Sequence, residues 1–217
     1  MTTPQVIAFA VCSYLLGSVS FGLVLGRLLR GIDIRDYGSG SAGATNTGRT
    51  LGLKAFIAVF VLDLLKGLIP VVIAKVVADD ARLEVIAGLA AIIGHDFPIF
   101  HGFRGGRGIA TSIGATIGMM PLVGLLIPFL AGVILIPFRY VSLMSVLGGV
   151  VTALIIVALA VTNRVPDSYA VFAVIAAALI VWPHRGNITR RRAGTEPKLG
   201  QGSGVRPRDA EHMRGHP

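Results

Sequence analysis

The sequence is short of charge and of cysteine, and both shortages restrict the class of protein. Only 14% of its 217 residues are charged, whereas 53% are hydrophobic and the mean hydropathy is +0.76. This exceeds the apolar content that one water-soluble core requires, so the composition predicts a chain embedded in a lipid bilayer. The single cysteine, Cys12, excludes a disulfide framework and argues against a metal site built on thiolates.

The N-terminus lacks the features of a cleavable signal peptide. No basic residue precedes its apolar stretch, and no convincing small-residue cleavage site follows, so we expect a retained membrane span. Further apolar stretches follow it along the chain. Together they cover residues 4–27, 55–77, 83–100, 109–119, 121–138, 141–162 and 168–183.

The number of crossings is decided by charge, because segment 109–119 is shorter than the roughly 20 residues that a span needs. With the N-terminus outside and seven crossings, sixteen of the twenty basic residues fall on the cytoplasmic side, as positive-inside topology requires. One kinked helix over 109–138 would instead send the basic tail outside. We therefore expect an all-α integral membrane protein of about seven transmembrane helices, with a short tilted helix at 109–119, a turn at 119–121 and a cytoplasmic C-terminus.

The segment GSGSAGATNTGRTLG (38–52) reads as a long loop that buries little and is suited to an anion. Its glycines permit a nest of backbone N–H groups, Ser39 and Asn46 add donors, and Arg49 can bind a phosphate bidentately. A flexible linker is the alternative, although linkers rarely mix Asn, Thr and Arg so densely. GATNTGRT is also one substitution from a nucleotide-binding P-loop, but no sheet strand precedes it, which disfavours that interpretation.

The segment HDFPIFHGFRGGRG (95–108) predicts a second phosphate site. It pairs two arginines with glycine backbone just before a helix expected at Ile109, and a helix N-terminus favours anions. The residues proposed for this site are Arg104, Gly105, Gly106, Arg107 and Gly108. The alternative is that the arginines only enforce topology.

Four ionisable groups fall at membrane depth, namely His95, Asp96, Asp63 and Lys66. His95 is either a satisfied core histidine or part of a site, since the adjacent Asp96 is a carboxylate in an unfavourable place. Asp63 and Lys66 lie on one face of the second span, where they either neutralise each other for structure or serve function. The expected topology places four segments on one membrane face. They are the two phosphate segments (38–52 and 95–108), RYVSLMSV (139–146) and HRGNITRRRAGTE (184–196).

These four motifs, in this order between apolar spans, resemble the bacterial acyl-phosphate:glycerol-3-phosphate acyltransferase family. The resemblance covers residues 1–198 and implies a single polytopic acyltransferase domain in the bacterial inner (cell) membrane. It implies transfer of an acyl group from acyl phosphate to the 1-position of glycerol 3-phosphate, giving lysophosphatidic acid and phosphate. Membrane lipids would be the remaining partners, with no nucleic acid, cofactor or metal. Residues 199–217 are expected to form a disordered basic tail.

The resemblance also assigns residues. It implies catalytic roles for His184, Asn187, Ser142 and His95, and substrate binding by Ser39, Asn46, Arg49, Arg104, Gly105, Gly106, Arg107, Gly108, Ser145 and Glu196. In two respects the sequence departs from the family. Ser41 stands where the family has Asn, and Arg104 and Arg107 stand where it has lysines, so charge is kept but the phosphate geometry differs.

An acyl phosphate is already activated, so no protein nucleophile is required. His184 is the first candidate to orient a substrate or accept its proton, followed by His95, and the phosphate of glycerol 3-phosphate is a third possible base. A phosphate or organophosphate transporter is the alternative from another class, but we find no internal repeat of the kind transporters carry.

Overall fold

The computed structural model describes residues 1–200, and all regular structure within that range is helical. The α-helices are α1 (Thr3–Gly17), α2 (Phe21–Arg30), α3 (Ala44–Leu51), α4 (Leu53–Ala78), α5 (Ala81–Asp96), α6 (Ile109–Met119), α7 (Pro121–Phe138), α8 (Val141–Val161), α9 (Asp167–Val181) and α10 (Arg185–Arg192). Short 3-10 helices occupy Ile34–Asp36 (η1), Ile99–His101 (η2) and Trp182–His184 (η3).

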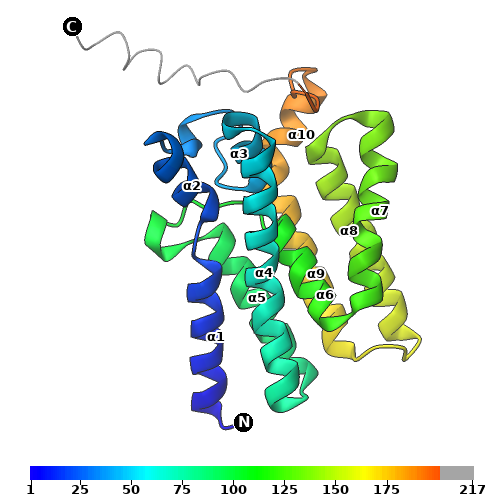
Figure 1. The fold of residues 1–217 in the computed structure, drawn as a ribbon. Helices are drawn as coiled ribbons and strands as arrows, with labels where there is room; N and C mark the ends of the chain where they lie inside the picture. Colours follow the sequence, from blue (N-terminus) through cyan, green and yellow to red (C-terminus); the bar gives the residue numbers. More distant parts are fainter. Residues whose placement is uncertain (201–217) are drawn as a thin grey trace, which may run out of the picture.

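The helices form a membrane-spanning bundle (Figure 1). Among residues 1–200, six helical stretches are long and apolar enough to cross a bilayer, and α6 is a shorter apolar helix. At 1.5 Å per residue the 11 residues of α6 cover about 16 Å, roughly half of the hydrocarbon core. Helix α7 starts directly after Met120 and runs back alongside α6 (Figure 1). The expected short helix and turn are therefore confirmed, and the single kinked helix is wrong.

The first apolar stretch is broken, which its hydropathy did not predict. Helix α1 ends at Gly17 and α2 begins at Phe21. The break leaves the carbonyl of Val19 without a helical partner, and the buried Lys66 ammonium donates to it at 2.8 Å. Because an unpaired backbone carbonyl is costly in hydrocarbon, this hydrogen bond stabilises the unwound segment. Lys66 therefore has a structural role at the break.

Glycine allows the central helices to touch backbone to backbone. A Cβ placed on Gly67 of α4 would lie 2.1 Å from the Thr111 carbonyl oxygen, and one on Gly114 of α6 would lie 1.9 Å from that of Leu64. Glycine pairs α1 with α5 in the same way, through Gly17 and Gly94. Small residues at such contacts replace the hydrophobic driving force that is absent between helices in lipid. Helix α7, by contrast, buries only Gly124 and lies at the periphery.

Of the tail expected to be disordered, 199–217, residues 201–217 lie outside the described part of the chain. The described residues 199 and 200 follow α10, and Leu199 is hydrogen-bonded to the turn between α7 and α8. The N–H of Leu199 donates to the Arg139 carbonyl at 2.7 Å, and the Arg139 guanidinium donates to the Leu199 carbonyl at 3.1 Å. The chain end that follows α10 therefore lies against this turn.

Candidate active site

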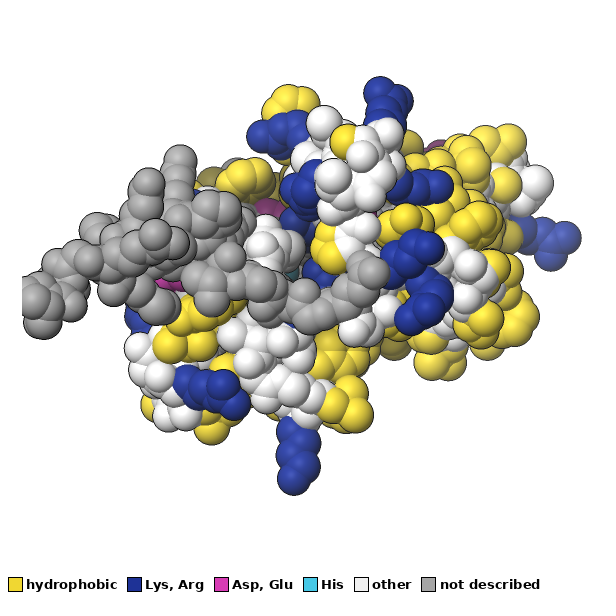
Figure 2. Space-filling view, turned by 90° about the horizontal axis from the view of Figure 1, so that it is seen from above, with side chains coloured by type: hydrophobic (Ala, Val, Ile, Leu, Met, Phe, Trp, Pro, Cys, Tyr) yellow, Lys and Arg dark blue, Asp and Glu magenta, His cyan; other side chains and the backbone are white. Residues whose placement is uncertain are grey.

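The four polar segments gather at the end of the bundle where α3 and α10 lie (Figure 1). A cavity of about 760 Å³ opens among them. Figure 2 views this end and shows arginine and lysine side chains spread over it, with apolar side chains along its margins. Of the residues predicted for the site, those that line the cavity are Ser39, Asn46, Arg49, His95, Arg107, Ser142, Ser145, His184, Asn187 and Glu196.

The glycine-rich segment is not a long open loop, because residues 44–51 form helix α3. Asn46, only 1% exposed, organises the turn before that helix. Its Oδ1 accepts from the N–H of Ser39 at 2.9 Å, and its Nδ2 donates to the carbonyls of Ile34, Tyr37 and Ser41. The expectation of a loop that buries little is therefore wrong for this half of the segment. The Asn46 amide holds the loop, which places Ser39 at the cavity.

Arg49 projects from the last turn of α3 into the cavity wall. Burial lowers the pKa of Arg49, the carboxylate of Glu196 opposes that shift, and Arg190 adds to it. The guanidinium nevertheless stays charged at neutral pH. A charged group partly withdrawn from water attracts an anion more strongly than one at the surface, because the local dielectric constant is lower. Arg49 is therefore well placed for a phosphate.

The glycines of the second segment have a different role from the one predicted. The N–H of Gly105 donates to the Asp96 carbonyl and that of Gly106 to the His95 carbonyl, at 3.2 and 3.0 Å. These amides are engaged within the loop, so they are not the exposed donors that the sequence predicted, and binding of a substrate by the two glycines stays a prediction. A Cβ on Gly106 would lie 1.9 Å from Nε2 of His95, and one on Gly105 would lie 2.0 Å from the His95 carbonyl oxygen. Glycine is required here because this loop packs directly on His95.

The two arginines of this segment separate. Arg107 lines the cavity beside the first residues of α6, where the N-terminal end of the helix dipole also favours an anion. Gly108, which caps that helix, has a φ of +66°, a conformation that favours glycine. Arg104 is exposed and does not line the cavity, so the structure does not bring its side chain to the predicted phosphate site.

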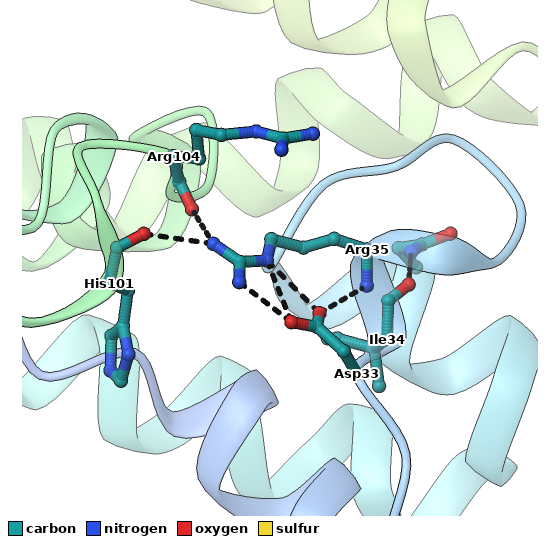
Figure 3. A network of polar contacts seen from close by, with 6 residues as sticks. Asp33, Ile34, Arg35, His101 and Arg104 are labelled. Atoms are coloured by element: carbon teal, nitrogen blue, oxygen red, sulfur yellow. Dashed lines mark hydrogen bonds and ion pairs between the residues drawn. The ribbon is translucent and has the colours of Figure 1, made fainter.

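Arg35, one of the sixteen basic residues expected on the cytoplasmic side, holds this loop in place (Figure 3). Its Nη1 donates to the carbonyls of His101 and Arg104 at 2.9 and 3.0 Å, while its Nη2 pairs with Asp33 at 2.6 Å. Burial alone would raise the pKa of Asp33, but hydrogen bonds from Arg35 and its charge outweigh burial and lower it. The spacing of Asp33 and Arg35 was the available sequence signal, although it does not identify the distant carbonyls.

Of the two charged residues of the second span, Asp63 lines the cavity beside His95 and Lys66 does not. Lys66 Nζ lies 2.8 Å from Asp63 Oδ1, and His95 Nδ1 lies 3.5 Å from the same oxygen. All three residues are buried, and both Asp63 and His95 line the cavity. Of the two roles that the sequence left open for the Asp63 and Lys66 pair, the structure shows the structural one, and a role in function stays a prediction. Lys66 supports the break after α1, and Asp63 lies against a histidine of the site.

The opposite wall comes from α8, η3 and α10. Ser142 and Ser145 lie one turn apart on α8, and the Ser145 hydroxyl donates to the Val141 carbonyl at 2.9 Å. His184 is buried, with its Nδ1 2.7 Å from the Ile180 carbonyl. A carbonyl can only accept, so Nδ1 carries the proton, and in the neutral ring Nε2 is the acceptor.

Glu196 is held by α10. Its Oε1 accepts from Asn187 Nδ2 at 2.6 Å and its Oε2 from Arg190 Nε at 2.9 Å. These contacts fold the chain that follows α10 back over the cavity. Both oxygens therefore have protein partners, and Glu196 acts on the cavity mainly through its charge and its position.

The remaining walls are apolar and were not predicted as part of the site. Phe56 and Phe60 of α4 stack with ring centroids 5.8 Å apart, and Pro128 and Leu135 come from α7. Apolar residues in a span carry no sequence signal that separates a cavity wall from a lipid-facing surface. The site thus combines cationic groups at one end with an apolar extension between α4 and α7.

Comparison with known proteins gives consistent similarities. Residues 7–194 match a family model described as glycerol-3-phosphate acyltransferase. A glycerol-3-phosphate acyltransferase of Halalkalibacterium halodurans is 45% identical over 191 residues, covering 87% of this chain and 93% of the relative. One from Thermoanaerobacter pseudethanolicus is 43% identical over 192 residues, covering 88% and 94%.

Solved structures agree with these relatives. The crystal structure of PlsY (YgiH), an integral membrane glycerol 3-phosphate acyltransferase, in its glycerol 3-phosphate form is similar, with a TM-score of 0.84 and 38% identity. Its lysophosphatidic acid form gives a TM-score of 0.82 at the same identity. Each similarity covers 90% of this chain and 96% of the solved chain.

Proposed function

Because the chain belongs to the glycerol-3-phosphate acyltransferase family, we propose that it transfers a fatty acyl group from acyl phosphate to the 1-position hydroxyl of glycerol 3-phosphate. The products would be lysophosphatidic acid and inorganic phosphate, in the first acylation step of phospholipid synthesis. One observation carries the proposal: Arg49 and Arg107, from two separate motifs, line one cavity that also has an apolar wall. Two phosphate-bearing substrates, one of them a lipid, match this arrangement.

In this mechanism the cavity aligns two reactants. The 1-hydroxyl oxygen of glycerol 3-phosphate attacks the acyl carbonyl carbon, an ester bond forms, and the bond from that carbon to the phosphate oxygen breaks. The hydroxyl proton passes to Nε2 of His184, whose Nδ1 is fixed by the Ile180 carbonyl, and from there to the departing phosphate, which returns the imidazole to its neutral form. Arg49 binds the acceptor phosphate, and Arg107 with the N-terminus of α6 stabilises the departing phosphate. The donor is already activated, so alignment supplies much of the acceleration.

The acyl chain would lie against the apolar wall of the same cavity. Phe56 and Phe60 on one side and Pro128 and Leu135 on the other come from helices that border the membrane. Each buried CH₂ group contributes about 0.8 kcal/mol, so a long acyl chain gains affinity from this contact. A lipid substrate can thus arrive from the bilayer while glycerol 3-phosphate arrives from water. We propose that this water is the cytoplasm of a bacterial cell and that the membrane is the inner (cell) membrane, because basic residues gather at this end.

A reconstituted assay tests the donor. Purified protein receives synthetic palmitoyl phosphate and glycerol 3-phosphate, without coenzyme A or carrier protein, and lysophosphatidic acid and phosphate are both quantified. We expect equimolar products, and no product when palmitoyl coenzyme A replaces palmitoyl phosphate. Product from the thioester alone would overturn the proposed donor. Counterflow of radiolabelled glycerol 3-phosphate in proteoliposomes, without acyl transfer, would favour a transporter instead.

A further inference from the structure

A second, smaller pocket of about 70 Å³, open on one side, lies between α6, α7, α8 and α9. We call it the inner chamber. It shares part of its lining with the active-site cavity, namely Ile109, Ile113, Ala131, Met144 and Ser145. The two spaces are therefore neighbours across one layer of side chains. At its far end the inner chamber meets Ile156 and Phe172, each only 1% exposed.

The size and lining of the inner chamber suit hydrocarbon. Apart from a few hydroxyl groups such as those of Thr116 and Thr152, the lining is aliphatic or aromatic. Its volume is about half of the 150 Å³ cavity that accommodates benzene in a protein interior, so it has room for about three carbon atoms. From Ser142 to Ile156, α8 rises about 21 Å, more than the roughly 15 Å half-thickness of the hydrocarbon core. An extended acyl chain that starts near Ser142 has the length to reach this depth.

Gly148 opens the inner chamber on the α8 side. The residue is buried, yet a Cβ placed on it would meet no atom within 4 Å. The glycines that bring helices together behave differently, since a Cβ on Gly67 or Gly114 would collide with backbone. Close helix packing does not therefore explain a glycine at 148. Gly148 lines the inner chamber, and the space that a larger side chain would occupy is part of that chamber.

We propose that the inner chamber receives the methyl end of the acyl chain and that Gly148 and Ile156 set the longest chain the enzyme uses efficiently. The proposal rests on the proposed acyl transfer and adds a determinant of substrate length. On this path the first part of the acyl chain follows the apolar wall described above and only its methyl end enters the inner chamber; the alternative is that the whole chain stays between α4 and α7 and ends in the bilayer. That path imposes no fixed length, so the two arrangements differ in their dependence on chain length.

The test compares variants over a series of acyl phosphates with ten to eighteen carbons, measuring kcat/KM for each. Gly148→Leu fills the inner chamber, and we expect it to lower kcat/KM for the longest efficient substrates by about 50-fold, which corresponds to three CH₂ groups that lose their burial. Substrates shorter by four carbons should keep their rates, as should the KM for glycerol 3-phosphate. Ile156→Ala deepens the chamber and should shift the optimum toward longer chains. Ala158→Leu, which adds bulk at an exposed position of α8, is the matched control and should leave the profile unchanged.

The outcomes separate the two proposals. If the wild-type protein uses no acyl phosphate, the proposed function fails and the length determinant fails with it. If the wild type is active but both chamber variants keep its chain-length profile, acyl transfer stands and the inner chamber is refuted as a length determinant. If Gly148→Leu does not fold, the smaller Gly148→Ala substitution and Ile156→Ala decide, since opposite shifts of the optimum support the proposal and an unchanged optimum overturns it.

Discussion

The backbone N–H of Ala42 donates a hydrogen bond of 3.1 Å to the carbonyl of Gly105. This bond joins the glycine-rich segment before α3 to the loop before α6, although the two are far apart in the sequence. The two predicted phosphate-binding motifs are therefore one structural unit. Because of this connection, Arg49 and Arg107 come to the same cavity instead of serving separate sites.

Arg49→Ala should raise the KM for glycerol 3-phosphate by about 10- to 100-fold, the range expected for loss of a hydrogen bond to a charged group worth roughly 1.5–3 kcal/mol. The KM for acyl phosphate should change much less. Initial rates over both substrate concentrations measure this. Arg185→Ala is a matched control, because Arg185 is exposed on α10 and stacks on Trp182 away from the cavity. An unchanged KM for glycerol 3-phosphate would remove Arg49 from the acceptor site.

Arg107→Ala and Arg104→Ala should differ sharply. The Arg107 side chain lines the cavity, whereas Arg104 contributes only its backbone carbonyl to Arg35, and alanine retains that carbonyl. We expect Arg107→Ala to lower kcat with acyl phosphate by about 100-fold, as for other donors to developing charge. Arg104→Ala should stay within about twofold of wild type. Equal losses in both variants would show that the separation of the two side chains is irrelevant to activity.

His184→Gln should slow turnover by about 10²- to 10⁴-fold, the usual contribution of a general base, with little change in either KM. Glutamine retains hydrogen-bonding capacity but cannot accept the proton as imidazole does. Stopped-time assays at saturating substrates give kcat. Normal turnover in this variant would assign proton removal to another group, such as the phosphate of glycerol 3-phosphate.

Gly106→Ala should destabilise the protein by about 1–3 kcal/mol, because its Cβ would overlap the His95 ring. For a chain of this length each kcal/mol lowers the Tm by about 2–4 °C. Removal of the His95 side chain should relieve this overlap, so Gly106→Ala should destabilise a His95→Ala protein less than it destabilises the wild type. Gly105→Ala is the matched control, since its clash is with the His95 carbonyl and no side-chain deletion relieves it. Thermal unfolding in detergent is measured for the wild type, the three single variants and the two double variants that combine each glycine substitution with His95→Ala, and equal rescue of both glycine variants would contradict the proposed contact.

The ion pair of Asp33 with Arg35 should stabilise the protein at neutral pH and lose that effect in acid. The pKa of Asp33 lies below its ordinary value of 3.8, so the folded state favours the ionised carboxylate. Such a group stabilises above its ordinary pKa and loses the contribution as pH falls through the folded-state value. The difference in Tm between wild type and Asp33→Asn should therefore be constant from pH 7 to about 5 and shrink below about pH 4. Asp36→Asn, at an exposed position, should change Tm little; a constant Asp33→Asn difference down to pH 3 would contradict the prediction.

Hydropathy and charge predicted most of the architecture, because the bilayer demands long apolar helices and short basic connections. They predicted the short α6 and its turn for the same reason: Pro121 and a basic tail left few alternatives. They could not predict the break after Gly17, since residues 18–20 are as compatible with a helix as their neighbours. The group that satisfies the break comes from Lys66, which is distant in the sequence and donates to the Val19 carbonyl.

Which residues lie at the site was easier to predict than the role of each one. Motif chemistry correctly indicated that Arg49 and Arg107 lie together, yet it gave Gly105 and Gly106 an anion-binding role although their amides bind carbonyls within the loop. Glycine serves close packing and amide exposure equally well, so its presence alone does not distinguish them. Asn46 was likewise predicted as a substrate ligand, whereas its amide is engaged by four backbone groups.

Helix α7 buries one residue, while α4 and α6 touch through glycine without any side chain between them. Helix α7 is therefore packed less closely against the rest of the described bundle than α4 and α6 are against each other. An outward movement of α7 would let a phospholipid or the lysophosphatidic acid product pass from the cavity into the bilayer, while the wall that carries Arg49 and Arg107 stays in place. Because the lipids that border α7 would have to make room for such a movement, bilayer fluidity would affect the release of product.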